Sequence, residues 1–141
     1  MASFAEIREA LRAALADVFE PDVTVTAYMK KNPGPRHMQV MGPDQIEYDL
    51  AMQRGLDRWT LVIQAFAGSP EEKAAQARLD TWLAGSGATS VKAAVEADQT
   101  LGGVVTAARV SRSSGYREYD LSNRGDRTLG AEFFVDVFTE H

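Results

Sequence analysis

The chain has 141 residues, of which 45% are hydrophobic and 25% charged, so it is long enough for one domain with its own core. Its net charge of −5 is opposite to the basic balance typical of a dedicated nucleic-acid binder. The absence of cysteine excludes disulfides, thiol nucleophiles and thiolate zinc ligands. The chain has no run of about 18 apolar residues to predict a transmembrane helix, and its acidic, amphipathic start does not resemble a secretory signal.

An amphipathic helix is predicted over residues 3–19. Ser3 and Glu6 have the spacing of a capping box, in which each side chain bonds a free backbone N–H at a helix start. The apolar residues recur at spacings of three and four, which places them on one face: Phe4, Ile7, Leu11, Leu15 and Val18. Residues 20–22 end the helix, and the alternation over residues 23–28 predicts a half-buried strand.

A basic segment follows this strand at residues 30–37. It carries Lys30, Lys31, Arg36 and His37 together with two prolines and a glycine, which predicts an exposed loop. One interpretation is a solvated loop without a binding role. The other is that these four residues contact an acidic partner surface or passing DNA, since positive charge on an acidic subunit favours such contacts.

The central part of the chain predicts three strands. Segments 38–41 and 46–53 have short alternating patterns, and Gly55 with Asp57 ends the second of them. Residues 59–66 are apolar on both faces, which is typical of a central strand covered on both sides.

Two helices are predicted next. Ser69-Pro70-Glu71-Glu72 combines a capping serine, a proline at the first helical position and a box glutamate. Buried positions of this helix are expected at Ala75, Leu79, Trp82 and Leu83, and Gly85 or Gly87 ends it. Residues 90–97 predict a shorter helix.

The last third of the chain predicts strands over residues 104–110, 116–121 and 129–137, with turns at 111–115 and 122–127. One face of the last strand is apolar: Leu129, Ala131, Phe133, Val135 and Val137. We therefore expect one α+β domain over residues 1–141. It has a mainly antiparallel sheet, with an N-terminal helix and a central helix pair packed against it.

The two histidines do not predict a catalytic or metal site. His37 lies in the predicted loop and His141 is the last residue, and a histidine base needs a positioned partner. Paired carboxylates at Glu47 and Asp49 can act as acid and base or bind a cation. The alternative is the solvent face of an edge strand, and strand alternation alone produces such pairs. Glu118 and Asp120 have the same spacing.

The outward face of the last strand carries Phe134 and Phe138 beside Glu132 and Asp136. Phenylalanines on a nominally solvent-facing side predict covering by a helix or by a neighbouring subunit. Because aromatic residues are enriched at interfaces, the subunit-interface candidates are Tyr116, Tyr119, Phe134 and Phe138. Ordinary core positions are the alternative for these residues.

The order of elements and one sequence block carry a family resemblance. The block SVKAAVEADQTLGGVV, which follows RLDTWL, resembles the equivalent region of tail terminator proteins of long-tailed (siphovirus-type) bacteriophages. The resemblance extends to the N-terminal helix, the strand led by Trp59, the Leu101-Gly102-Gly103 junction and the terminal β ribbon.

This resemblance implies a hexameric ring that caps the tail tube, stops its polymerisation and provides the face for head–tail joining. The implied partners are further copies of the chain, the tail tube protein and a head-completion or neck protein. DNA would pass through the ring without sequence-specific binding. The implied location is the head-proximal end of the virion tail, and the host cytoplasm during assembly. We expect no enzyme activity, catalytic residue, metal, cofactor or membrane contact.

Three alternatives remain open. The first is a neck or head-completion (head–tail connector) protein, because such proteins share size and ring geometry. The second is a small metal-dependent hydrolase or nuclease that uses Glu47 and Asp49. The third is a plain cytosolic binding module.

Overall fold

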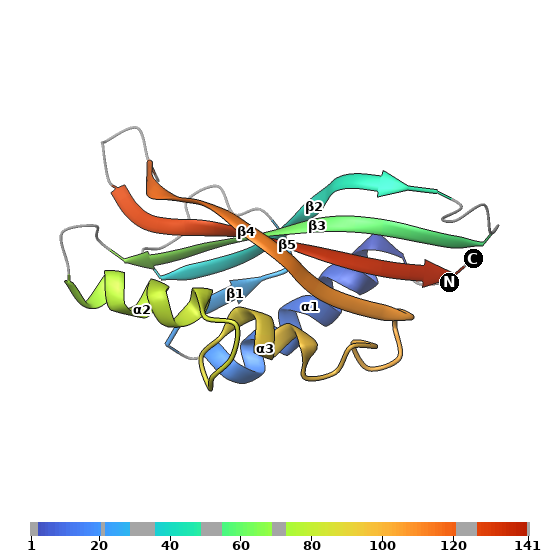
Figure 1. Cartoon of the computed structure of the whole chain (residues 1–141), viewed down its shortest axis with the longest axis horizontal. Coiled ribbons are helices and arrows are strands. Elements are labelled where there is room, and N and C mark those ends of the chain that lie inside the picture. The colour runs from blue at the N-terminus through green and yellow to red at the C-terminus, as the bar shows by residue number, and fades with distance from the viewer. Residues whose placement is uncertain are drawn as a thin grey trace.

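The computed structural model describes residues 3–20, 22–28, 36–48, 55–68, 73–120 and 127–140. These residues form an α+β fold (Figure 1), as predicted. The elements in chain order are α1 (Phe4–Phe19), β1 (Thr24–Thr26), β2 (His37–Glu47), β3 (Leu56–Gly68), α2 (Lys73–Leu83), α3 (Val91–Glu96), β4 (Ala107–Asp120) and β5 (Arg127–Glu140).

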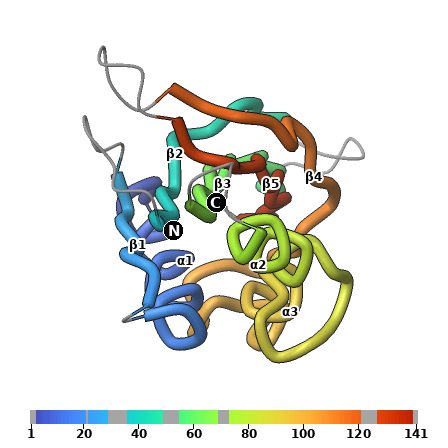
Figure 2. Tube along the Cα trace, turned by 90° about the vertical axis from the view of Figure 1, so that its left-hand side faces the viewer, coloured from blue at the N-terminus to red at the C-terminus, as the bar shows by residue number. Residues whose placement is uncertain are grey.

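The five strands form one sheet in the order β1-β2-β3-β5-β4. Strands β2, β3, β5 and β4 pair antiparallel, whereas β1 runs parallel to β2, so the sheet is mixed but mainly antiparallel. All three helices lie against the same face of the sheet (Figures 1 and 2). We call this the inner face and the opposite one the outer face.

Helix α1 supplies one side of the core. Ser3 caps its start as predicted, since the Glu6 N–H donates to Ser3 Oγ at 3.2 Å, which is the serine half of the predicted capping box. The inward residues are Ile7, Leu11, Leu15 and Phe19, all buried. Phe19 packs edge-on to Trp82 of α2, with 5.8 Å between ring centroids. The prediction that Val18 is buried is wrong: it is 38% exposed, because the four-residue spacing continues to Phe19.

Strand β5 confirms its predicted inner face, since Leu129, Ala131, Phe133, Val135 and Val137 are all buried. Strand β3 is a central strand as predicted but begins earlier. Asp57, predicted to break the pattern, lies inside β3 and is 2% exposed.

The two short strands predicted around residues 38–53 are one strand as far as the structure describes them. Strand β2 runs through Gly42 and Pro43, and its pairing with β3 shifts register between Val40 and Pro43 and between Pro43 and Gln45. Such irregularities absorb extra residues without ending a strand. Residues 49–53 of the prediction lie outside the described part of the chain.

Helices α2 and α3 agree with the predicted pattern where they are described. Ala75, Leu79 and Trp82 are buried, whereas Leu83 is half-buried. The predicted cap at residues 69–72 lies outside the described residues. Helix α3 begins after Ser90, whose Oγ accepts from the Ala93 N–H at 3.2 Å. In the described part of the chain, no helix has the length and apolar character needed to cross a membrane.

Candidate assembly surface along strand β4

Strand β4 is an edge of the sheet and is paired to β5 on one side. The turn predicted at residues 111–115 is wrong, because β4 continues through it to Asp120. Register shifts between Val110 and Arg112 and between Ser114 and Arg117 absorb the extra residues. Side chains 111–118 are exposed apart from the half-buried Gly115. An edge strand offers backbone N–H and C=O groups to another chain, so this stretch is a potential interaction surface.

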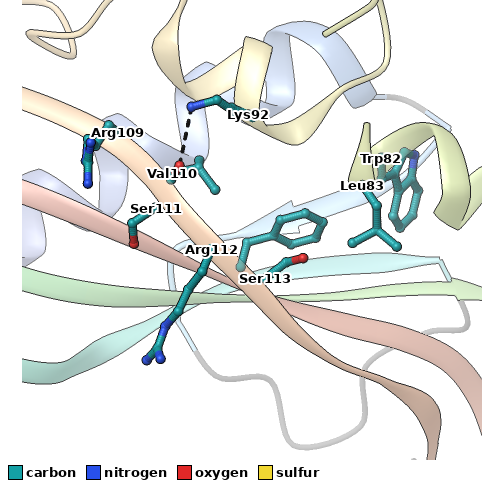
Figure 3. Close-up of a pocket in the computed structure, with 9 residues that line it drawn as sticks. Trp82, Leu83, Lys92, Arg109, Val110, Ser111, Arg112 and Ser113 are labelled. Atoms are coloured by element: carbon teal, nitrogen blue, oxygen red, sulfur yellow. Dashed lines mark hydrogen bonds between the residues drawn. The ribbon is translucent and has the colours of Figure 1, made fainter. Parts of the chain in front are cut away.

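Helix α3 covers the edge at one position, Val110. The Val110 N–H donates to Glu96 Oε2 at 3.0 Å, and the Val110 carbonyl accepts from Lys92 Nζ at 3.4 Å (Figure 3). Lys92 and Glu96 also pair with each other at 2.5 Å. Burial raises the pKa of Glu96, but the bonds from Lys92 and Val110 outweigh it, so the net pKa is lowered. The exposed edge therefore begins after Val110.

A pocket of about 290 Å³ opens where the ends of α2 and α3 meet β4 (Figure 3). Its lining is Trp82, Leu83, Lys92, Arg109, Val110, Ser111, Arg112, Ser113 and Phe133. Trp82, Leu83 and Phe133 give it an apolar part, whereas Lys92 and the two arginines contribute charge. The Arg112 side chain points away from Trp82 (Figure 3). The pocket therefore has room for an apolar side chain beside a basic strand.

Two arginines of β4 lie over aromatic rings. Arg112 Cζ is 4.0 Å from the centroid of the Phe134 ring, and Arg117 Cζ is 4.7 Å from that of Tyr119. Such cation–π contacts hold the guanidinium and the ring together while the cation stays accessible. Both arginines are exposed, whereas Phe134 and Tyr119 are half-buried.

Tyr119 is fixed from two further directions. Its hydroxyl donates to the Gly115 carbonyl at 2.6 Å, and its ring lies edge-on to Phe66 at 5.6 Å between centroids. The two rings crowd Gly130 of β5, where an added Cβ would lie 2.5 Å from the Ala65 carbonyl oxygen. Burial raises the pKa of Tyr119, which agrees with this packing.

The other two predicted interface residues lie in different settings. Tyr116 is 48% exposed, and its pKa is raised by partial burial and by Asp80 of α2 beside it. Phe138 is half-buried and pairs with Arg58 of β3 and Ala107 of β4. Phe134 and Phe138 project from the outer face, and the described helices all lie on the inner one. We predicted that a helix or a neighbouring subunit covers these two phenylalanines. Among the described residues, no helix covers them.

The prediction that residues 30–37 form a basic loop is wrong at one residue. His37 is not in a loop: it is the first residue of β2, 1% exposed, with its Nε2 at 3.1 Å from Thr26 Oγ1. A side chain so buried has no surface for a partner. Arg36, directly before β2, is exposed. Lys30 and Lys31 lie outside the described residues.

Three of the four paired carboxylates lie in the described part of the chain, and these three have partners across strands. Glu47 forms an ion pair with Arg58 of β3, while Asp49 lies outside the described residues. Arg127 lies 3.2 Å from Glu118 and 4.0 Å from Asp120. Within the described ranges, no group of three or more His, Asp or Glu side chains could hold a metal ion.

On the outer face of β5, Asp136 is buried and accepts from the Thr60 hydroxyl at 2.9 Å. Glu132 is half-buried and pairs with Gln64 of β3. Charged side chains therefore lie among the aromatic residues on this face.

Sequence reasoning missed the role of Lys92 and Glu96. Their spacing of four residues on a helix was a visible signal of an ion pair. Their contact with Val110, 14 residues further along the chain, depends on how α3 packs against β4.

Comparison of the sequence with protein-family models gives no match, and comparison with curated proteins gives none either.

Proposed function

We propose that this chain is a structural assembly subunit, a bacteriophage tail terminator that forms a ring at the end of the tail tube. The observation that carries the proposal is the edge stretch of β4 from Ser111 to Asp120, whose side chains are mostly exposed, with a partly apolar pocket beside it. A closed ring joins one patch of each subunit to a different patch of the next. An edge strand with a neighbouring pocket is suited to be one of those patches.

The outer face supports the same role. Phe134, Phe138 and Tyr119 lie half-buried there, with arginines over two of the rings. Aromatic residues and arginine are the residue types enriched at protein interfaces. The resemblance of the Trp82–Val110 region to tail terminators supports this choice of assembly. In this role the ring would stop tube growth and present a face to a head-completion protein, while DNA passes through without sequence-specific contacts.

The test adds the purified protein to polymerising tail-tube subunits of the same phage and measures tube lengths by negative-stain microscopy. We expect shorter tubes with extra density at one end. The matched control is a variant with Arg112→Glu and Arg117→Glu, which reverses the charge of the β4 surface and is checked for folding by circular dichroism. Tube lengths equal to those without the protein, with bare ends, would rule out a terminator.

A further inference from the structure

We infer that two copies of this chain pair through strand β4, antiparallel across a two-fold axis. Their sheets then join into one sheet of ten strands, five from each copy. The inference goes beyond the proposed ring, because it concerns subunits that have not yet reached a tail and it stands on the geometry of β4. A paired edge is closed to other strands, so the pair has to separate before β4 can serve in a ring.

The two edges of the sheet, β1 and β4, differ in how open they are (Figure 2). Strand β1 has three residues, and the Val25 N–H on it donates to Glu20 Oε1 at 3.3 Å. Strand β4 has 14 residues, and helix α3 bonds it at Val110. The segment 111–120 lies beyond that point and offers its outward N–H and C=O groups to another strand. Pairing between copies is therefore expected at β4 and not at β1.

One register pairs the whole open segment with itself. It places the two-fold axis between Gly115 and Tyr116, so that residue 111 of one copy lies opposite residue 120 of the other. The pairs nearest to the axis after these two residues are Ser114 with the partner's Arg117, Ser113 with the partner's Glu118, and Arg112 with the partner's Tyr119. The paired segment ends next to Val110, so the bonds of α3 to that residue are kept.

This register joins residues that project from the same face. Directly opposed residues of neighbouring strands share a face, so the β5 partner gives the face of each β4 residue. Four residues of the pairs lie opposite outer-face positions of β5: Arg112, Ser114, Arg117 and Tyr119. The other two lie opposite buried inner-face residues of β5: Ser113 and Glu118. Each of the three pairs therefore has both members on one face.

The register shift between Ser114 and Arg117 makes this match possible and selects a second β4 as the partner strand. The two members of each pair are an odd number of positions apart, and in a regular strand such residues project from opposite faces. The shift places Ser114 and Arg117 on the same face. Bulges protect an edge from pairing with regular strands. A second copy of β4 carries the same shift at the same point, so the residue counts of the two strands agree.

Charge complementarity on the outer face supports the register. Glu132 of β5 lies opposite Ser114, and Ser114 lies opposite the partner's Arg117, so these residues follow one another across three neighbouring strands. With about 4.8 Å between strands, the glutamate and the arginine have to span about 10 Å over the small serine, which two long side chains can do. Neither Glu132 nor Arg117 forms an ion pair within the described residues. The two-fold axis forms the contact twice.

The charges of the open segment also disfavour other registers. Segment 111–120 contains two arginines and two acidic residues, so two copies meet without net repulsion. A slip of one residue joins opposite faces. A slip of two residues in one direction sets Arg112 opposite the partner's Arg117, and like charges directly opposite destabilise a sheet. A slip of two residues in the other direction shortens the paired segment.

Disulfide trapping tests the register, because the natural chain has no cysteine. A Ser113→Cys variant is mixed with a Glu118→Cys variant under mild oxidation, which leaves Glu132 and Arg117 intact. We expect a linked dimer with one copy of each variant. Each variant oxidised alone is the matched control and should give background linkage, because its cysteine lies opposite a different residue. Linkage in the mixture no higher than in the single variants would overturn the inference.

Charge exchange within one chain tests the contact between Glu132 and Arg117. By light scattering coupled to gel filtration, we expect the natural chain to have the mass of two 15.4 kDa chains. Arg117→Glu should shift it to the monomer, and Arg117→Glu combined with Glu132→Arg should restore the dimer. Lys73→Glu makes the same charge change at an exposed position on α2 and should leave the dimer intact.

Circular dichroism melting checks that each variant folds. A natural chain that stays monomeric at every concentration, or a folded double variant that does not regain the dimer, would overturn the pairing. These results are separate from the tube assay. A trapped dimer with unchanged tube lengths keeps the pairing and removes the terminator role, whereas tube capping by a chain that is monomeric in solution keeps the role and removes the pairing.

Discussion

Glu96 Oε2 of helix α3 accepts a hydrogen bond from the backbone N–H of Val110 at 3.0 Å. A helix side chain therefore occupies a hydrogen-bonding position on the edge strand β4. Lys92 bonds the carbonyl of the same residue at 3.4 Å and pairs with Glu96. Through this unit α3 both attaches to the sheet and protects one point of its edge from other strands. The continuous run of exposed residues on β4 is the segment that follows.

Replacing Glu96 with alanine should destabilise the fold. The change leaves the Val110 N–H without its acceptor and removes the ion pair of Lys92, and a lost bond to a charged group costs about 1–2 kcal/mol. Urea unfolding followed by circular dichroism measures the free energy of unfolding. The control is Glu9→Ala, which removes an exposed ion pair with Arg12 and should cost less than about 0.5 kcal/mol. Equal losses in the two variants would show that the Val110 contact has no special weight.

The same carboxylate should make stability depend on acid pH. The pKa of folded Glu96 lies below its ordinary value of 4.5, so its contribution is present above that pH and is lost as pH falls through the folded pKa. We therefore expect the difference in unfolding free energy between the natural chain and Glu96→Gln to shrink from pH 7 to pH 3. Unfolding series at several pH values measure it. A difference that stays constant over this range would contradict the assignment.

Gly130 should tolerate no side chain. A Cβ there would lie 2.5 Å from the Ala65 carbonyl oxygen and 3.0 Å from Phe66 Cδ1, and backbone cannot yield as a flexible side chain does. Gly130→Ala should therefore cost about 1–3 kcal/mol through overpacking. The control is Gly85→Ala, where no atom lies within 4 Å of the added Cβ. Thermal melting should lower the midpoint for the first variant alone, and matching midpoints would refute the crowding at Gly130.

The fold was predictable from the sequence where the local pattern of a segment and its tertiary packing favour the same structure. The helical spacing over residues 7–15 and the alternation along β5 both point to a single buried face, and both are confirmed. The segment 111–115 was not predictable, because its serines and glycine favour a turn locally. Its pairing with Phe133 and Phe134 of β5 keeps it in a strand instead.

The candidate surface was predictable only in part. Outward aromatic residues such as Phe134 follow from strand alternation, and their outer-face position is confirmed. The pocket and the hydrogen bond between Glu96 and Val110 depend on how α2, α3, β4 and β5 pack together. The periodicity of the sequence does not predict that packing. His37 was placed in a loop because prolines precede it, whereas its pairing with Phe66 draws it into the sheet.

Val18 and Phe19 are neighbours at the end of α1, but truncating each should change stability by very different amounts. Phe19 is 5% exposed and packs against Trp82, so Phe19→Ala should cost about 3–5 kcal/mol by removing a buried ring. Val18 faces solvent at 38% exposure, so Val18→Ala should change the free energy of unfolding by less than about 0.5 kcal/mol. Chemical denaturation of the two variants measures both values. A large loss of stability for Val18→Ala would mean that Val18 is buried, as the sequence analysis predicted.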